Sequence, residues 1–185
     1  MMTLVFFLEE LSAKEMLNGI LPKILPDNIQ SRFVVFEGKQ DLEKQLVRRL
    51  RLWRTPNCRF FVLRDQDSGD CRLIKRNLLN KCNEANKTNT IVRIACHELE
   101  SFYLGDLHAV YKGLKLSGLS KLQNKRKYRE PDNLLNPAQE SVALTNNYYQ
   151  KVSGSRAISK YLSLEENCSH SFNVLVKAII AVIDT

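Results

Sequence analysis

The residues of this chain that are best suited to chemistry are carboxylates that follow short apolar runs. Three such groups occur, and each begins within a few residues of the end of its run. Their members are Glu9, Glu10, Asp65, Asp67, Glu98 and Glu100. A short continuous apolar run is typical of a strand that is buried on both faces of a parallel sheet. Ligands bind outside the carboxyl ends of such strands, so we expect the three groups to share one edge of one sheet.

Carboxylates gathered in this way need a positive charge, because packing like charges together costs free energy. Carboxylate oxygens are hard ligands, and Mg²⁺ is the usual hard ion at such sites, with Mn²⁺ as a substitute. Each acid also has an ordinary structural explanation, as a turn residue, a helix cap or a partner of a helix dipole. A calcium-binding EF-hand loop is excluded, because the twelfth residue counted from Asp65 is Arg76 and not glutamate.

The elements that must position these acids alternate between strands and helices. We predict strands over residues 3–8, 33–36, 59–63 and 90–95, and later helices over residues 41–54, 71–86, 137–149, 155–162 and 170–183. The first helix is expected to begin at Ser12, which has Glu15 three residues later in a capping-box pattern, and Pro22 must kink or end it. Strands and helices that alternate with short links favour an α/β fold with a mostly parallel four-stranded sheet flanked by helices.

The length of 185 residues suits one domain. Residues 1–112 form the predicted α/β core. Residues 117–136 are polar and basic. We expect residues 113–185, which comprise this basic insertion and the C-terminal helices, to pack on the same domain. No apolar run reaches the ~18 residues that cross a bilayer, and the start of the chain has no basic leader. The sequence therefore predicts no membrane partner and no signal peptide.

The charge and the cysteines point to a cytoplasmic protein with a polyanionic partner. The chain has 28 Lys and Arg against 20 Asp and Glu, a net charge of +8, which favours nucleic acid. The five cysteines are odd in number and form no C-x-x-C pair, so neither a disulfide framework nor a zinc knuckle is expected. A reducing cytoplasm is the simplest interpretation.

Four stretches resemble the TOPRIM superfamily of topoisomerases, primases and nucleases. They are Phe-Leu-Glu-Glu-Leu-Ser at 7–12, Asp-Gln-Asp-Ser-Gly-Asp at 65–70, Glu-Leu-Glu-Ser-Phe-Tyr-Leu-Gly-Asp at 98–106, and the stretch 151–172. The chain is most similar to a TOPRIM-like branch that is paired with ABC-type ATPases in phage defence. It departs from the family pattern at Glu10, where glycine is usual, and at Phe102, where tryptophan is usual.

This resemblance implies a TOPRIM-like fold and a Mg²⁺-dependent nuclease, with an ABC-type ATPase as its partner. Glu9, Asp65 and Asp67 would hold the metal, and Glu98 or Glu100 would contribute to a second ion. On a helix two residues that are two apart diverge by ~200°, so both face one site only on extended backbone, and we favour Glu100. Glu9 as a general base is a second possibility, ranked lower because a carboxylate beside Mg²⁺ makes a poor base.

Basic residues are the candidates for holding the nucleic acid. Lys151 and Arg156 lie in a stretch that carries the resemblance, so they are expected to stabilise charge on the scissile phosphate. A cluster formed by Lys121, Lys125, Arg126, Lys127 and Arg129 is the predicted phosphate-binding surface, with Tyr128 as a possible stacking residue. A basic face between Arg48 and Arg54 is equally suited to an acidic ATPase. We expect His97 and His170 to be structural.

Two other classes of function compete with a nuclease. The chain could be a non-catalytic module that docks on the ATPase, with the acids holding a structural ion. It could also bind nucleic acid through its basic face without cutting it, in which case salt should release the ligand.

Overall fold

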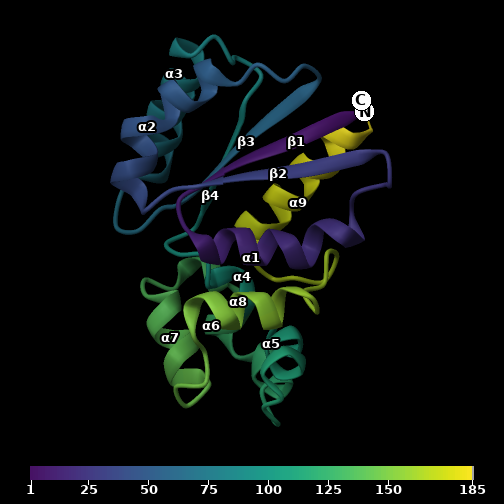
Figure 1. The fold of residues 1–185 in the computed structure, drawn as a ribbon. Coiled ribbons are helices and arrows are strands. Elements are labelled where there is room, and N and C mark those ends of the chain that lie inside the picture. The colour runs from purple at the N-terminus through teal and green to yellow at the C-terminus, as the bar shows by residue number, and fades with distance from the viewer. Residues whose placement is uncertain (185) are drawn as a thin grey trace.

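A computed structural model describes residues 1–184 and confirms an α/β fold with a Rossmann-like, all-parallel sheet (Figure 1). The sheet has four strands in the order β2-β1-β3-β4. The strands are β1 (Met2–Leu8), β2 (Ile29–Val35), β3 (Cys58–Asp65) and β4 (Ile91–Ala95). β1 and β3 are the central strands, so the acids that follow them lie at the middle of the carboxyl edge.

Helices flank the sheet and form a layer beyond its carboxyl edge. They are α1 (Leu11–Ile20), α2 (Lys39–Leu52), α3 (Cys71–Glu84), α4 (Ser101–Leu104), α5 (Leu107–Leu114), α6 (Arg126–Arg129), α7 (Pro137–Leu144), α8 (Lys151–Ser159) and α9 (His170–Ile183). Three 3-10 turns, η1 (Leu21–Lys23), η2 (Ser120–Asn124) and η3 (Pro131–Asn133), connect them. Figure 1 shows α2 and α3 on one face of the sheet, α1 and α9 on the other, and α4 to α8 gathered together below.

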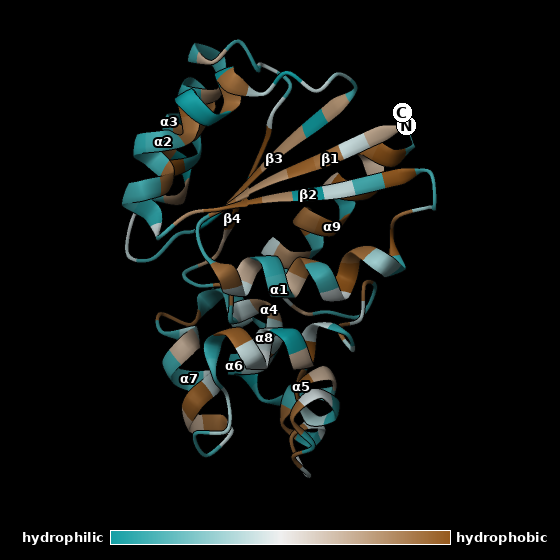
Figure 2. Ribbon diagram, in the orientation of Figure 1, coloured by the Kyte–Doolittle hydropathy of each residue, from teal (hydrophilic) through white to brown (hydrophobic). Residues whose placement is uncertain are grey.

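The central strand β1 explains why a continuous apolar run forms this sheet. Side chains alternate between the two faces of a strand, so both faces of a covered strand must be apolar. Leu4, Phe6 and Leu8 are fully buried in the core beneath α1 and α9, whereas Val5 and Phe7 are fully buried in the core beneath α2 and α3. Figure 2 shows this division, with hydrophobic strands and helices α2 and α3 that are hydrophilic on their outer side.

The first core also joins the two halves of the chain. It contains residues of β1, β3 and α1 together with Tyr149, Ile158 and Phe172 from the C-terminal part of the chain. Helix α8 packs closely on α1 and α5 because two glycines remove the side chains that would separate them. A Cβ on Gly19 would lie 2.1 Å from Ser159 Oγ, and a Cβ on Gly113 would lie 2.7 Å from Ile158 Cα. These contacts fix α8, and with it Lys151 at its first turn.

Several predicted boundaries are wrong for identifiable reasons. The capping box at Ser12 does not form: α1 begins at Leu11, Glu10 occupies the cap position, and the Ser12 hydroxyl donates to the Glu10 carboxylate instead. The second strand begins at Ile29 and not at residue 33. As an edge strand it is only partly buried, and its first half carries the consecutive polar residues Gln30, Ser31 and Arg32, which hid it from an apolar pattern. Pro22 does end the first helix as predicted, with α1 stopping at Ile20.

The C-terminal helices differ from their predicted ranges in a similar way. Helix α7 stops at Leu144, because Asn146 and Asn147 adopt left-handed backbone with φ of 50° and 67°. Helix α8 then begins at Lys151, four residues before the predicted start. In residues 1–184 the five cysteines are free thiols, and no helix is long and apolar enough to cross a membrane.

Candidate functional site

The carboxyl ends of β1 and β3 bring Glu9 and Asp65 together, as the positions of the two residues after apolar runs suggested. The strands pair in parallel up to Leu8 and Leu63, and the Glu9 N–H donates to the Leu63 carbonyl at 3.3 Å. The Asp65 N–H in turn donates to Glu9 Oε2 at 3.1 Å. Glu9 is therefore held against the end of the neighbouring strand by a backbone donor, which fixes its carboxylate at the centre of the sheet edge.

Asp65 is a buried acid in a strongly negative environment. It is only 7% exposed. Burial, and then the negative charges of Glu10, Glu9 and Glu100, raise its pKa well above the ordinary value, and the ammonium of Lys151 only partly opposes them. Burial is also the main reason why the pKa of Glu9 is raised, with a further contribution from the charge of Asp67. At both acids, burial and the neighbouring carboxylates therefore disfavour the charged form.

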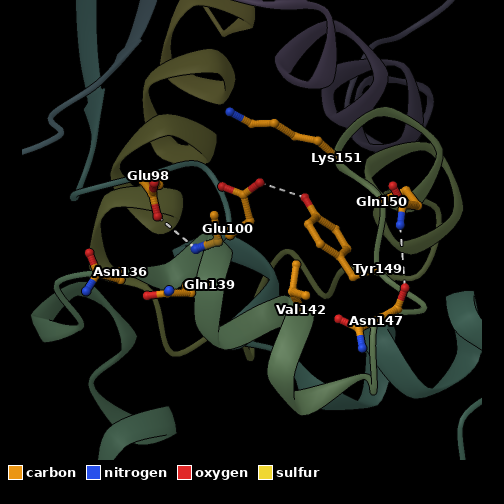
Figure 3. A pocket seen from close by; sticks show the side chains of 10 residues that line it. Glu98, Glu100, Asn136, Gln139, Val142, Asn147, Tyr149, Gln150 and Lys151 are labelled. Carbon is orange, nitrogen blue, oxygen red and sulfur yellow. Dashed lines mark hydrogen bonds between the residues drawn. The ribbon is translucent and has the colours of Figure 1, made fainter.

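Glu100 enters the same cluster from the turn after β4 (Figure 3). Its side chain is fully buried, and its Oε1 accepts a hydrogen bond from the Tyr149 hydroxyl at 2.8 Å. Burial raises the pKa of Glu100, although this bond and the charge of Lys151 oppose the shift. Among the described residues its Oε2 has no hydrogen-bond partner. A buried carboxylate oxygen without a partner is rare, so it marks a place where a ligand would be stabilised.

Lys151 is the cation of this cluster. Its Nζ lies 2.7 Å from Glu10 Oε2, and its side chain is 47% exposed, so the ammonium borders both the acids and solvent. Burial alone would lower its pKa, but the hydrogen bond to Glu10 and the charges of Glu10, Glu100 and Asp65 outweigh that effect and raise it. Figure 3 shows the ammonium extending across the space beside the Glu100 carboxylate.

The remaining two predicted ligands lie outside this cluster. Asp67 follows Asp65 at the rim, with left-handed backbone at φ of 54°, and its Oδ2 accepts from Lys39 Nζ at 2.8 Å. Glu98 points in another direction than Glu100: its Oε2 accepts from the Ala138 N–H at 2.8 Å and so caps the start of α7 (Figure 3). The chain turns between the two glutamates, which is why they reach different partners.

The donor chemistry of the cluster fits a hard divalent cation, but its present geometry is that of an internal ion pair. Glu9, Asp65 and Glu100 offer only oxygen donors, as Mg²⁺ requires, and the partnerless Oε2 of Glu100 is a ready ligand. Within residues 1–184, however, no three Asp, Glu, His or Cys side chains are placed so that they could hold one metal ion together. The positive charges beside these acids in the structure are those of Lys151 and, next to Glu9, of Arg64.

The predicted phosphate-binding cluster is exposed and lies on η2 and α6, in the helical layer. Its members are Lys121, Lys125, Arg126, Lys127 and Arg129. Lys127 pairs with Glu140 at 2.8 Å. The predicted stacking role of Tyr128 is wrong, because Tyr128 is only 2% exposed and its hydroxyl donates to Glu140 at 2.6 Å. A buried ring cannot offer its face to a base, so this surface can supply charge but not stacking.

Two further predicted residues have structural partners. Arg156 pairs with Glu15 at 2.7 Å between Nε and Oε2 and so links α8 to α1. His97 Nδ1 lies 3.2 Å from the carbonyl oxygen of Asp67, which joins the loops after β3 and β4.

Tyr149 is the site residue that the sequence analysis missed. It lies in a loop between two helices, where no periodicity or motif marks it, and its only signal is that it comes two residues before Lys151.

The fold and the site together define a Rossmann-like α/β protein with a partly buried cluster of acids, bordered by a lysine, at the carboxyl edge of its parallel sheet. The chain belongs to the family described as "Domain of unknown function (DUF4276)", whose model matches residues 8–180. Searches of curated proteins and of solved structures gave no match.

Proposed function

We propose that this protein is a Mg²⁺-dependent nuclease that cleaves phosphodiester bonds, with Mn²⁺ able to replace Mg²⁺. One observation carries the proposal: Glu9, Asp65 and Glu100, which are distant in sequence, converge at the carboxyl edge. Burial raises the pKa of each, and the charges of Glu9 and Glu100 further raise the pKa of Asp65. Such an accumulation of buried acids is costly unless a cation offsets it, and it is typical of functional sites. The net charge of +8 favours a polyanionic substrate.

In this proposal Glu9, Asp65 and Glu100 hold the ion, and Asp67 borders it from the rim. When bound, Mg²⁺ would lower the pKa of a water molecule and offset the charge that develops on the phosphoryl oxygens. The Asp65 N–H and the Tyr149 hydroxyl orient Glu9 and Glu100, respectively. Lys151 borders solvent, so its ammonium can exchange its contact with Glu10 for a phosphate oxygen.

The partner proposal rests on the resemblance and on one charged surface. Helix α2 and the residues after it expose Arg48, Arg49 and Arg54, and none of the three has an ion-pair partner among residues 1–184. This basic face suits an acidic surface on an ABC-type ATPase. Free cysteines agree with a reducing cytoplasm as the place where the two would meet.

The nuclease proposal is tested with a single charge-removing substitution and its matched control. Asp65→Asn removes a buried carboxylate of the cluster, and Asp70→Asn removes an exposed carboxylate while keeping an oxygen that can cap α3. Single-stranded and double-stranded DNA and RNA are incubated with each variant in Mg²⁺, in Mn²⁺ and in EDTA. We expect cleavage by the wild type and by Asp70→Asn in either metal, at least about 100-fold less by Asp65→Asn, and none in EDTA.

A second candidate is the docking module, and the Lys151–Glu10 pair favours it. If the lysine is a permanent counterion, the cluster needs no metal, and the acids serve only to place α8 on the sheet. Isothermal titration with Mn²⁺ distinguishes the two candidates. If the wild type binds Mn²⁺ and Asp65→Asn does not, the result supports the nuclease. If the folded wild type does not bind Mn²⁺, the result supports the docking module.

A further inference from the structure

A cavity of about 570 Å³ opens directly beside Glu100 and Lys151 (Figure 3). This volume lies within the range of about 300–1,000 Å³ that is usual for small-ligand sites. Its walls come from the start of α7, the loop that follows α7, and the first residue of α8. The cavity therefore adjoins the carboxylate cluster but is built mainly by the C-terminal helices.

Carboxamide side chains dominate the polar wall of this cavity. They are Asn136, Gln139, Asn147 and Gln150. The side chains of the first three make no hydrogen bond to any residue of 1–184, so their donors and acceptors are available. A carboxamide presents a donor and an acceptor side by side, which is the arrangement that pairs with the edge of a nucleobase. Val142 and the ring of Tyr149 supply the apolar part of the wall.

The charge distribution around the cavity disfavours duplex nucleic acid. Proteins hold a duplex mainly through several Lys and Arg contacts to its phosphates, and Lys151 is the one basic residue in this wall. The Watson–Crick edges of the bases in a duplex are paired inside the helix, and a whole base cannot enter a cavity of this kind unless it is turned out of the stack. Glu100 is among the residues that line this cavity, and its buried Oε2 has no hydrogen-bond partner among the described residues, which independently marks the place as one where a ligand would be stabilised.

A second hollow continues the cavity along the sheet edge. It has a volume of about 440 Å³ and shares Glu98 and Asn136 with the first, and its lining includes Asp67 and Leu135. Leu135 is 74% exposed, so its side chain is accessible to a ligand in this hollow. An exposed apolar side chain at this position can contact the face of a neighbouring base. The two hollows together provide room for more than one nucleotide of a strand.

We propose that the ligand of this groove is an unpaired strand of nucleic acid, with one base seated among the carboxamides next to Glu100 and Lys151. The ammonium of Lys151 then contacts the phosphate of that nucleotide, and Leu135 lies against an adjacent base. The cutting of this strand rests on the proposed nuclease function, whereas its binding does not. The two can therefore fail separately.

The test measures binding in EDTA, where no metal-dependent cleavage can occur. Fluorescently labelled 12-nucleotide single strands of DNA and of RNA, and the corresponding DNA duplex, are titrated with the full chain. We expect the better of the two single strands to bind at least tenfold more tightly than the duplex. Comparison of the two single strands assigns the substrate to DNA or RNA.

A double variant and a matched control connect this preference to the cavity. Asn136→Ala with Gln139→Ala removes two carboxamides of the wall, and Asn77→Ala with Asn80→Ala removes two exposed ones with the same spacing on α3. We expect the cavity variant to bind the single strand 5- to 20-fold more weakly and the α3 variant to bind it unchanged. Circular dichroism establishes that both remain folded.

The outcomes separate the two proposals. Equal or tighter binding of the duplex, no binding of any strand, or an unchanged affinity in the cavity variant would overturn the inference, even if Mg²⁺-dependent cleavage of duplex is found. Selective single-strand binding that depends on Asn136 and Gln139, without cleavage in Mg²⁺ or Mn²⁺, would support the inference and overturn the nuclease.

Discussion

Lys151 Nζ lies 2.7 Å from Glu10 Oε2, a contact between the first turn of α8 and the residue that follows β1 and Glu9. This pair joins the C-terminal helical layer to the centre of the sheet edge. It places a cation among acids that otherwise repel one another, and it leaves that cation at the border of the cavity formed by α7 and α8. The lysine is therefore the residue through which the helical layer and the sheet share one site.

Replacing Lys151 with methionine tests whether this cation acts on the substrate. We expect Lys151→Met to reduce cleavage on the order of 100-fold, because a donor for the developing charge is lost. The melting temperature should change little, because the side chain is 47% exposed and partly exposed ion pairs contribute less than about 1 kcal/mol. Lys160→Met, an exposed lysine at the other end of α8, is the control. Unchanged cleavage in Lys151→Met would contradict the role.

The hydroxyl of Tyr149 is expected to stabilise the fold through Glu100. Tyr149→Phe removes the donor to a fully buried carboxylate oxygen, which should cost about 1–3 kcal/mol in the free energy of unfolding. The neighbouring Tyr148 is 68% exposed, so Tyr148→Phe should change stability by less than about 0.5 kcal/mol. Urea unfolding measures both. Equal stabilities for the two variants would mean that the Tyr149 bond contributes nothing.

The close approach of α5 and α8 predicts that Gly113 cannot be enlarged. The Cβ of Gly113→Ala would lie 2.7 Å from Ile158 Cα, so α8 must shift, at a cost of about 1–3 kcal/mol. Because α8 carries Lys151, cleavage should fall together with stability. Ser153→Ala changes an exposed position of the same helix and should preserve both. Thermal unfolding and the cleavage assay are compared, and a Gly113→Ala protein that matches Ser153→Ala would refute the tight packing.

The Glu15–Arg156 pair predicts a pH dependence of stability at the α1–α8 contact. The hydrogen bond from Arg156 lowers the pKa of Glu15. A carboxyl whose folded pKa lies below its unfolded value stabilises the protein above the unfolded pKa, near pH ~4.3, and this contribution is lost as the pH falls through the folded pKa. Arg156→Gln should therefore lose less stability than the wild type between about pH 5 and pH 3.

Urea unfolding at a series of pH values measures that difference, because all other carboxyls are common to the two proteins. Parallel stability curves over this range would show that the pair does not lower the pKa of Glu15. The comparison is independent of the nuclease assay, since Arg156 lies outside the carboxylate cluster.

The sheet and half of the site could be predicted because their signals are local. A run of consecutive apolar residues such as 3–8 can be satisfied only by a strand covered on both faces, and parallel strands necessarily end at one edge. The sequence thus placed Glu9 and Asp65 at the same edge, and the structure showed that the strands β1 and β3, at whose ends they lie, are neighbours. The capping box at Ser12 did not form because the hydroxyl donates to the nearby Glu10 carboxylate and does not cap a backbone amide.

The sequence by itself thus determined the α/β class, the parallel strands and the edge at which the acids of β1 and β3 gather. Only the tertiary structure decided that Glu100 joins them while Glu98 caps α7, that Tyr128 is buried, and that Tyr149 lies beside Glu100. Periodicity is a property of a few neighbouring residues, and the common edge of parallel strands follows from their shared direction. The direction of a side chain in a turn, or of a loop between helices, depends instead on packing between segments far apart in the chain.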